Sequence, residues 1–465
     1  MTAVYPQSLL HMKEKNTIVK GAFYLAVGAF ISKFLGAIYR VPLTNMLGGL
    51  GLGLYQMVFP VYCLLLDFSG AGLPSALSRL IASQTIDKER TAKRLLINSA
   101  KLFFIFGFVA MIIMLTFSKP FSILQGNKNA STAYIFLSPA ILAVALISCL
   151  RGYFQGFMDM KPTAISQIIE QSVKLVLGII LVYLLMDNVA LAVGGATFAI
   201  TMSEIIALII LFVIYKRKNR TSIGDFVYDK KTFFTDAKII IKTTIPITLV
   251  GILLPFSQVL DSILTINIIS GYRDDATILF GLLSGVVMTV INLPVSVCYG
   301  IGSVAVPSLS KCKDENEKQR QTIKILILTL IVSIPCFLGI AILSPQVINL
   351  LFRNLPINQK VIAIKLLRLT SPCVVFLSLL QASNSVFIGK GKLYTPVINL
   401  SIGVVSKLVI SIVLLSIPSI NIYGGAIALN ACYFIVCVIN LRLIFNKKVK
   451  NATDFHYNRK LANQE

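Results

Sequence analysis

The chain has 465 residues, of which 56% are hydrophobic and only 13% are charged, and its formal net charge is +24. So few polar residues cannot cover a water-soluble globule of this size, and the composition therefore indicates a polytopic membrane protein. Two histidines, His11 and His456, and eight scattered cysteines without a CxxC step give no framework for zinc or disulfides, so we expect no metal and no cofactor.

Apolar stretches recur along the chain, and each is long enough to cross about 30 Å of hydrocarbon, which takes about 20 helical residues. We expect all of them to be helices, because an open sheet edge in lipid would leave backbone groups unpaired. The sequence thus predicts an all-α membrane protein with about twelve transmembrane helices, at residues 21–39, 50–76, 102–117, 133–150, 164–186, 189–215, 245–269, 278–306, 325–343, 361–388, 393–417 and 422–445.

Most of the 43 basic residues lie on one set of alternate connecting segments. By the positive-inside rule, these segments and both termini face the cytoplasm of a bacterial cell, and the first helix, which has no cleavage site after it, is retained. Anionic membrane lipids are expected partners of this basic surface. Nucleic acid is not, because the charges are spread over short loops and do not form one stripe.

Three features of the middle of the chain recur 233 residues later. Ser138-Pro139, Gly156 and Lys174-Leu175 are matched by Ser371-Pro372, Gly389 and Lys407-Leu408. We therefore predict two six-helix bundles, 21–215 and 243–445, joined by a basic cytoplasmic linker, 216–242, and flanked by cytoplasmic tails, 1–20 and 446–465. Since six is even, the repeats are parallel, and rocking one bundle against the other is typical of a transporter.

Three runs near the N-terminus carry a resemblance to a known family: SKFLGAIYR at 32–40, GGLGLGLY at 48–55 and AGLPSALSR at 71–79. They resemble the polysaccharide transporter branch of the multidrug/oligosaccharidyl-lipid/polysaccharide exporter superfamily, and within it the stage V sporulation protein B group and the lipid II flippases. The resemblance implies a flippase that moves an undecaprenyl-pyrophosphate-linked oligosaccharide from the inner to the outer leaflet. Peptidoglycan or other polysaccharide synthesis, sporulation and cell-wall enzymes as partners are implied with it, and we expect a monomer.

Charged side chains inside the predicted helices are candidates for substrate binding, because each costs about 2.5 to 3.5 kcal/mol at a helix centre. Lys33 and Arg40 lie seven residues apart, on one face of the first helix, where two cations suit a pyrophosphate. Lys174 and Lys407 hold equivalent repeat positions and are expected to face a central cleft. Glu170, four residues before Lys174, leaves open a self-neutralising pair.

Other candidates leave more than one interpretation open. Arg368 is a possible ligand near the outer end of its helix, where it would also suit the membrane interface. Three acids, Asp67, Glu204 and Asp261, are expected either to bind a coupling cation or to pair with the lysines. Small residues and one proline are assigned to a hinge or to close helix packing: Gly36, Gly49, Gly51, Gly53 and Pro74.

Two other classes of function compete with the flippase. A cation-coupled multidrug exporter of the same superfamily is the alternative, although such a pump would be expected to have an acid where the first helix has Lys33. A membrane enzyme usually needs acid and base residues in a large outer loop. The longest outer loops, 118–132 and 344–360, have neither a carboxylate nor a histidine, so we predict no catalytic residues and no enzyme.

Overall fold

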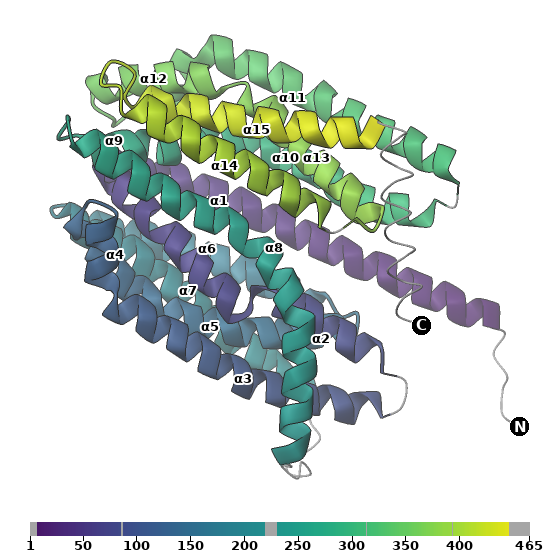
Figure 1. The fold of residues 1–465 in the computed structure, drawn as a ribbon. Helices are drawn as coiled ribbons and strands as arrows, with labels where there is room; N and C mark the ends of the chain where they lie inside the picture. The colour runs from purple at the N-terminus through teal and green to yellow at the C-terminus, as the bar shows by residue number, and fades with distance from the viewer. Residues whose placement is uncertain (1–6, 85–86, 219–229, 313, 393, 446–465) are drawn as a thin grey trace, which may run out of the picture. The chain divides into compact units, whose positions relative to one another are not determined.

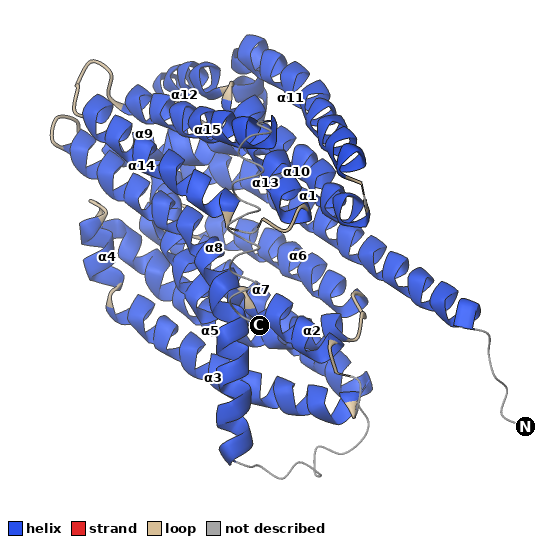
Figure 2. Ribbon diagram, turned by 45° about the vertical axis from the view of Figure 1, so that its right-hand side comes forward, coloured by secondary structure: helices blue, strands red, loops and turns tan. Residues whose placement is uncertain are grey.

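A computed structural model of the chain describes residues 7–84, 87–218, 230–312, 314–392 and 394–445 (Figure 1). Within these ranges the secondary structure is helical and contains no strand, which confirms the all-α prediction (Figure 2). In chain order the elements are α1 Gln7–Leu66, η1 Asp67–Ala71, α2 Leu73–Ala82, α3 Lys88–Thr116, α4 Ser118–Leu124, η2 Lys128–Ala130, α5 Ser131–Gly156, α6 Lys161–Leu184, α7 Val189–Lys218, α8 Lys230–Ser270, α9 Ala276–Gly281, η4 Leu282–Val287, α10 Met288–Lys311, α11 Glu315–Leu351, α12 Ile357–Thr370, α13 Cys373–Gly389, α14 Thr395–Leu415 and α15 Ile422–Phe445.

The helices confirm a multi-pass membrane protein. Among the described residues, ten helices are long and apolar enough to cross a membrane, or eleven if α12 and α13, bent by 47°, form one span. The sequence predicted about twelve, and the counts differ because the predicted span 21–39 and most of 50–76 fall within α1. Gly48 interrupts α1 with φ 63° and ψ −170°, a backbone conformation that glycine adopts without steric cost. Two helical segments therefore meet at Gly48.

The chain divides into two compact units, Met1–Ile263 and Leu264–Glu465, called here the first and second units. The division lies inside α8, whereas the sequence placed it in a linker at 216–242. Residues 219–229 of that linker lie outside the described residues, as does the whole tail 446–465, but 230–242 are helical. They belong to the first unit because Asp236 is tied to α3: its Oδ2 lies 3.1 Å from Arg94 Nε and accepts from Asn98 Nδ2 at 2.8 Å.

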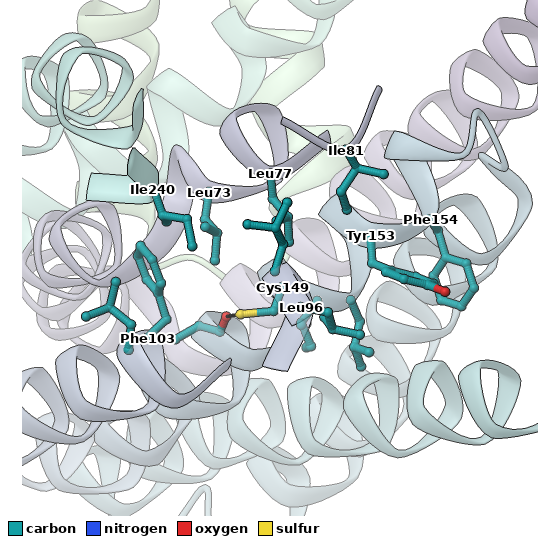
Figure 3. Close-up of a cluster of buried hydrophobic side chains, with 14 of the residues drawn as sticks. Leu73, Leu77, Ile81, Leu96, Phe103, Cys149, Tyr153, Phe154 and Ile240 are labelled. Atoms are coloured by element: carbon teal, nitrogen blue, oxygen red, sulfur yellow. Dashed lines mark hydrogen bonds between the residues drawn. The ribbon is translucent and has the colours of Figure 1, made fainter. Parts of the chain in front are cut away.

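A buried apolar cluster holds one part of the first unit together (Figure 3). Its members come from α2, α3, α5, α7 and α8, so that five elements share one core. At the contact of α2 and α5, a Cβ on Gly152 would lie 3.1 Å from Pro74 Cα, so the glycine lets the two helices approach closely. Labelled in Figure 3 are Leu73, Leu77, Ile81, Leu96, Phe103, Cys149, Tyr153, Phe154 and Ile240.

The repeated sequence features occupy similar places in the helices of the two units. Gly156 ends α5 and Gly389 ends α13, and a proline stands in the first turn of both α6 and α14. The repeats differ at their Ser-Pro steps. Pro139 lies within a continuous α5, whereas Ser371 and Pro372 separate α12 from α13, at the 47° bend.

Candidate functional site

Helices α1 and α6 approach each other closely in the first unit because small residues face large ones. Tyr39 of α1 is only 1% exposed, and a Cβ on Gly178 of α6 would lie 2.5 Å from the Tyr39 hydroxyl oxygen. Half-buried Gly36 likewise faces α6, where a Cβ on it would lie 3.3 Å from Gln171 Oε1. This spacing brings the polar residues of α6 next to those of α1.

Two of the cations predicted to bind substrate lie in this region. Lys174 is one turn before Gly178, and its Nζ lies 5.7 Å from the centroid of the Tyr39 ring, within cation–π range. Arg40 follows Tyr39 on α1 and interacts electrostatically with Lys174, and both cations interact with Cys63. The side chain of Lys33, predicted to act together with Arg40, lies outside the described residues.

A half-buried ion pair joins α5 to α6 beside these cations. Arg151 Nη2 donates to Glu170 Oε2 at 2.9 Å, and Arg151 Nε donates to Ser166 Oγ at 3.0 Å. Gln171 Nε2 donates to Glu170 Oε1 at 2.9 Å, so both oxygens of Glu170 accept a hydrogen bond. The sequence had left open a self-neutralising pair of Glu170 and Lys174. In the structure Glu170 is instead hydrogen-bonded to Arg151 and Gln171, and it attracts Lys174 only electrostatically.

Sequence reasoning missed Arg151, which it assigned to a cytoplasmic loop because the predicted helix ended at residue 150. In the structure α5 continues to Gly156, and the Arg151 side chain is only 16% exposed. The signal that could have found it is the aromatic pair that follows, Tyr153 and Phe154, since buried aromatic residues at that point favour a longer helix.

A second carboxylate, Glu204 of α7, completes the group. Glu204 is 6% exposed, lies within hydrogen-bonding reach of Glu170, and interacts electrostatically with Arg151 and Lys174. Its Oε2 has no hydrogen-bond partner among the residues that the structure describes. We call Arg40, Arg151, Glu170, Lys174 and Glu204 the charge cluster. Within the described ranges, no group of three His, Cys, Asp or Glu side chains is arranged to hold a metal ion.

The other two acids predicted as ion-coupling residues also belong to the first unit. Asp67 begins η1 and is half-buried, and a Cβ on Gly251 of α8 would lie 3.4 Å from Asp67 Oδ2. Asp67 therefore faces the backbone of α8, and it interacts with Cys63, as do Arg40 and Lys174. Asp261 lies further along α8 and is half-buried.

The remaining candidates are distributed over both units. In the second unit, Lys407 of α14 is 5% exposed, whereas Arg368 is exposed near the end of α12 and its Nε donates to Ser344 Oγ of α11 at 2.9 Å. In the first unit, Pro74 is half-buried in the first turn of α2. The glycines that follow the interruption at Gly48 in α1 are all buried: Gly49, Gly51 and Gly53.

Two family models match the chain. The model described as polysaccharide biosynthesis protein matches residues 18–313, which is more than half of the chain, and the model described as lipid II flippase MurJ matches residues 284–461.

Curated relatives from Bacillus subtilis (strain 168) agree with these families. The lipid II flippase MurJ is 26% identical over 91% of this chain and 81% of its own length. Stage V sporulation protein B is 27% identical over 66% of this chain and 60% of its own length. The resemblance inferred from the three N-terminal runs is confirmed.

Among solved structures, the lipid II flippase MurJ in an inward closed conformation matches with a TM-score of 0.71. The match covers 90% of this chain and 87% of that one, at 18% sequence identity. At that identity the likeness establishes a shared fold and leaves the substrate to be argued from the site.

Proposed function

This chain belongs to the polysaccharide biosynthesis protein family, and from that premise we propose that it is a flippase. It moves an undecaprenyl-pyrophosphate-linked oligosaccharide from the inner to the outer leaflet by alternating access. The proposal is supported by the lipid II flippase relative, which aligns over nine tenths of the chain, and by the transporter fold. Membership of a transporter family also favours transport over catalysis.

The observation that carries the proposal is the pair of cations, Arg40 and Lys174, inside the membrane-spanning part of the first unit. Two positive charges that repel each other in a membrane are costly unless an anion is present at some stage of the cycle. A pyrophosphate supplies two negative charges and several acceptor oxygens, and hydrogen bonds between ionised partners are about twice as strong as neutral ones. A pyrophosphate headgroup would therefore be stabilised by both Arg40 and Lys174.

The membrane potential can drive the proposed transport. Each charge that moves across 100 mV gains about 2.3 kcal/mol, so a doubly charged headgroup leaving an inside-negative cell gains about 4 to 5 kcal/mol. This energy requires that the cationic site face the cytoplasm when substrate binds. The basic segments support that orientation, with both termini cytoplasmic and anionic lipids near the basic loops.

The multidrug exporter remains the alternative, with Glu204 and Asp67 as its acids. The charge cluster contains three basic and two acidic residues, so it attracts anions more than organic cations. That balance favours the flippase. We also propose that Lys407 and Arg368 of the second unit contact the substrate. The protein is proposed to act as a monomer, with cell-wall synthesis enzymes as its partners.

Reconstitution separates the two functions. The purified chain is placed in vesicles with a fluorescent undecaprenyl-pyrophosphate disaccharide, and a membrane-impermeant quencher measures how fast the lipid changes leaflet. We expect rapid flipping of the pyrophosphate lipid and at least about tenfold slower flipping of the neutral prenol glycoside, because only the former can bind the two cations. Equal rates for both lipids, or transport of an organic cation alone, would reject the flippase.

A further inference from the structure

One carboxylate oxygen of Glu204 has no hydrogen-bond donor among the described residues. An ionised carboxylate accepts hydrogen bonds and cannot donate one, so two ionised carboxylates within reach of each other repel. Glu170 has a donor on each oxygen, from Arg151 and Gln171. Glu204 is 6% exposed, and its Oε2 has no partner among the described side chains. The two carboxyl groups are therefore not equivalent, and Glu204 is the one with an oxygen that no described group donates to.

Protonation of Glu204 would remove this buried negative charge. Burial of an unpaired carboxylate costs several kcal/mol, whereas the protonated acid is neutral and can donate to Glu170. The groups that face Glu204 come from three helices: Tyr62 of α1, Arg151 of α5, and Glu170 and Lys174 of α6. Arg151 and Lys174 both attract an ionised Glu204, but Arg151 also donates to Glu170 and Ser166 and is therefore shared between the two carboxylates.

We propose that Glu204 is a proton-binding site and that its protonation releases Lys174 to bind an anionic pyrophosphate. With both carboxylates ionised, the charge cluster carries three positive and two negative charges, a net of +1. A proton on Glu204 raises this to +2 and removes one of the two carboxylates, Glu170 and Glu204, that compete with phosphate for Lys174. Proton binding and anion binding therefore strengthen each other, and by linkage the effect is reciprocal. The second half of this proposal rests on the proposed function.

A proton fits the site better than a metal cation. Sodium and divalent ions need several oxygen ligands arranged around them. Here the oxygens of Glu170 already accept from Arg151 and Gln171, and no third acid, histidine or cysteine joins the two carboxyl groups among the residues that the structure describes. Two cations, Arg151 and Lys174, also face the position that a metal ion would occupy.

The proton site can be tested without transport. Infrared difference spectra of the purified full chain in nanodiscs, recorded between alkaline and acidic pH, detect the C=O stretch of protonated carboxylic acids. We expect one band of a buried acid in the wild type, its loss in Glu204→Gln, and its retention in Glu315→Gln, which makes the same chemical change at an acid that is 58% exposed. A band of unchanged amplitude in Glu204→Gln would overturn the proposal, as would a wild type without such a band.

A second variant covers the case in which Glu204→Gln does not fold. Glu170→Gln removes the negative neighbour and releases Arg151, so the charged form of Glu204 becomes more favourable. The band should remain in Glu170→Gln but disappear at a lower pH than in the wild type. A band that is unaffected by Glu170→Gln would show that its acid does not face Glu170, and would overturn the assignment.

The link to anion binding is measured by calorimetry with farnesyl pyrophosphate, a short soluble probe. Its own titration changes its charge, so the quantity compared is the ratio of affinities of wild type and Glu204→Gln at each pH. We expect the variant, which resembles the protonated acid, to bind about tenfold more tightly than the wild type at alkaline pH and equally at acidic pH.

The outcomes of the two experiments are distinguishable. A ratio that does not vary with pH would overturn the link while leaving the flippase in place. Absence of binding by either protein at every pH would overturn the anion site of the proposed function, and with it the link. An infrared band lost in Glu204→Gln would still establish the proton site.

Discussion

The two repeats place a lysine at the same point but surround it with different chemistry. Lys174 of α6 and Lys407 of α14 are 233 residues apart, and helices α7 and α15 begin at the same spacing. Arg40 corresponds at that spacing to Arg273, but the other three charged neighbours of Lys174 have no charged counterparts in the second unit. At that spacing Arg151, Glu170 and Glu204 correspond to Asn384, Gly403 and Cys437.

Neutral groups connect the helices of the second repeat. Asn399 Nδ2 donates to Asn440 Oδ1 at 2.7 Å, and Asn440 Nδ2 donates to Ser383 Oγ at 2.7 Å and to Asn384 Oδ1 at 3.2 Å. These bonds join α13, α14 and α15, as the Arg151–Glu170 pair joins α5 to α6. Equivalent helices can thus be held by an ionic or a neutral network, and only the ionic one can change its charge with pH.

The largest difference is expected when each network loses one partner. Arg151→Ala leaves the half-buried Glu170 without its cation, which should cost about 2 to 3 kcal/mol, more than an exposed pair and less than a fully buried one. Asn384→Ala removes one neutral hydrogen bond, at a cost of about 0.5 to 1.5 kcal/mol. Unfolding in mixed micelles of increasing denaturing detergent measures both free energies. Equal losses would contradict the distinction between an ionic and a neutral network.

The two lysines are expected to contribute similarly to affinity and differently to its pH dependence. Lys174→Met and Lys407→Met each remove a charge-assisted hydrogen bond to pyrophosphate, worth about 1.5 to 3 kcal/mol, and so weaken binding by about 10- to 100-fold. The pH dependence contributed by the protein should disappear only in Lys174→Met, since no carboxylate stands at the equivalent positions of the second repeat. Calorimetry across pH measures both. Persistence of the full pH dependence in Lys174→Met would separate Glu204 from that lysine.

The two repeats also differ in helix packing at the position of Glu170, where the second repeat has Gly403. A Cβ on Gly403 would lie 2.3 Å from Val436 Cγ2, so Gly403→Ala must push α14 away from α15 and should cost about 1 to 3 kcal/mol. Gly339 of α11 offers a matched control, because a Cβ there meets nothing within 4 Å. Gly339→Ala should stabilise by up to about 1 kcal/mol, the helix preference of alanine. If Gly403→Ala were as stable as the control, steric exclusion of a side chain would not explain the missing acid.

The smallest effect is expected at an exposed ion pair between α8 and α9. Arg273 donates to both carboxylate oxygens of Asp275, at 2.8 and 2.7 Å, and holds the pKa of Asp275 below its usual value. The pair therefore stabilises the fold above the ordinary aspartate pKa of about 3.9, and this contribution is lost as the pH falls through the lowered pKa. Because both side chains are about a third or more exposed, the loss should stay below about 1 kcal/mol.

Detergent-induced unfolding at acidic and neutral pH, compared between wild type and Asp275→Asn, measures that loss. A pH-dependent difference as large as the cost of Arg151→Ala would contradict the contrast between the exposed pair and the half-buried pair.

Hydrophobic runs predicted the helical fold, three N-terminal runs predicted the family, and the repeat assigned Lys174 and Lys407 to equivalent sequence positions. The sequence did not predict the interruption at Gly48, because an apolar run has the same composition whether the helix continues or is interrupted. It also ended α5 at residue 150, since a charge normally marks the end of a membrane span. Only the partner on α6, Glu170, makes Arg151 acceptable inside the protein, and that contact depends on how the helices pack. The approach of Glu204 to Glu170 has the same origin.

The central claim, that a cationic site in the first unit binds the pyrophosphate, is tested most directly by the rate of leaflet exchange in reconstituted vesicles. The double variant Arg40→Ala with Lys174→Ala is compared with Lys216→Ala with Arg217→Ala, which removes two exposed cations from the end of α7. We predict that the first double variant, folded as judged by its detergent unfolding, flips the pyrophosphate lipid at least about 100-fold more slowly than wild type, and that the second flips it normally. Normal flipping by the first double variant would contradict the account.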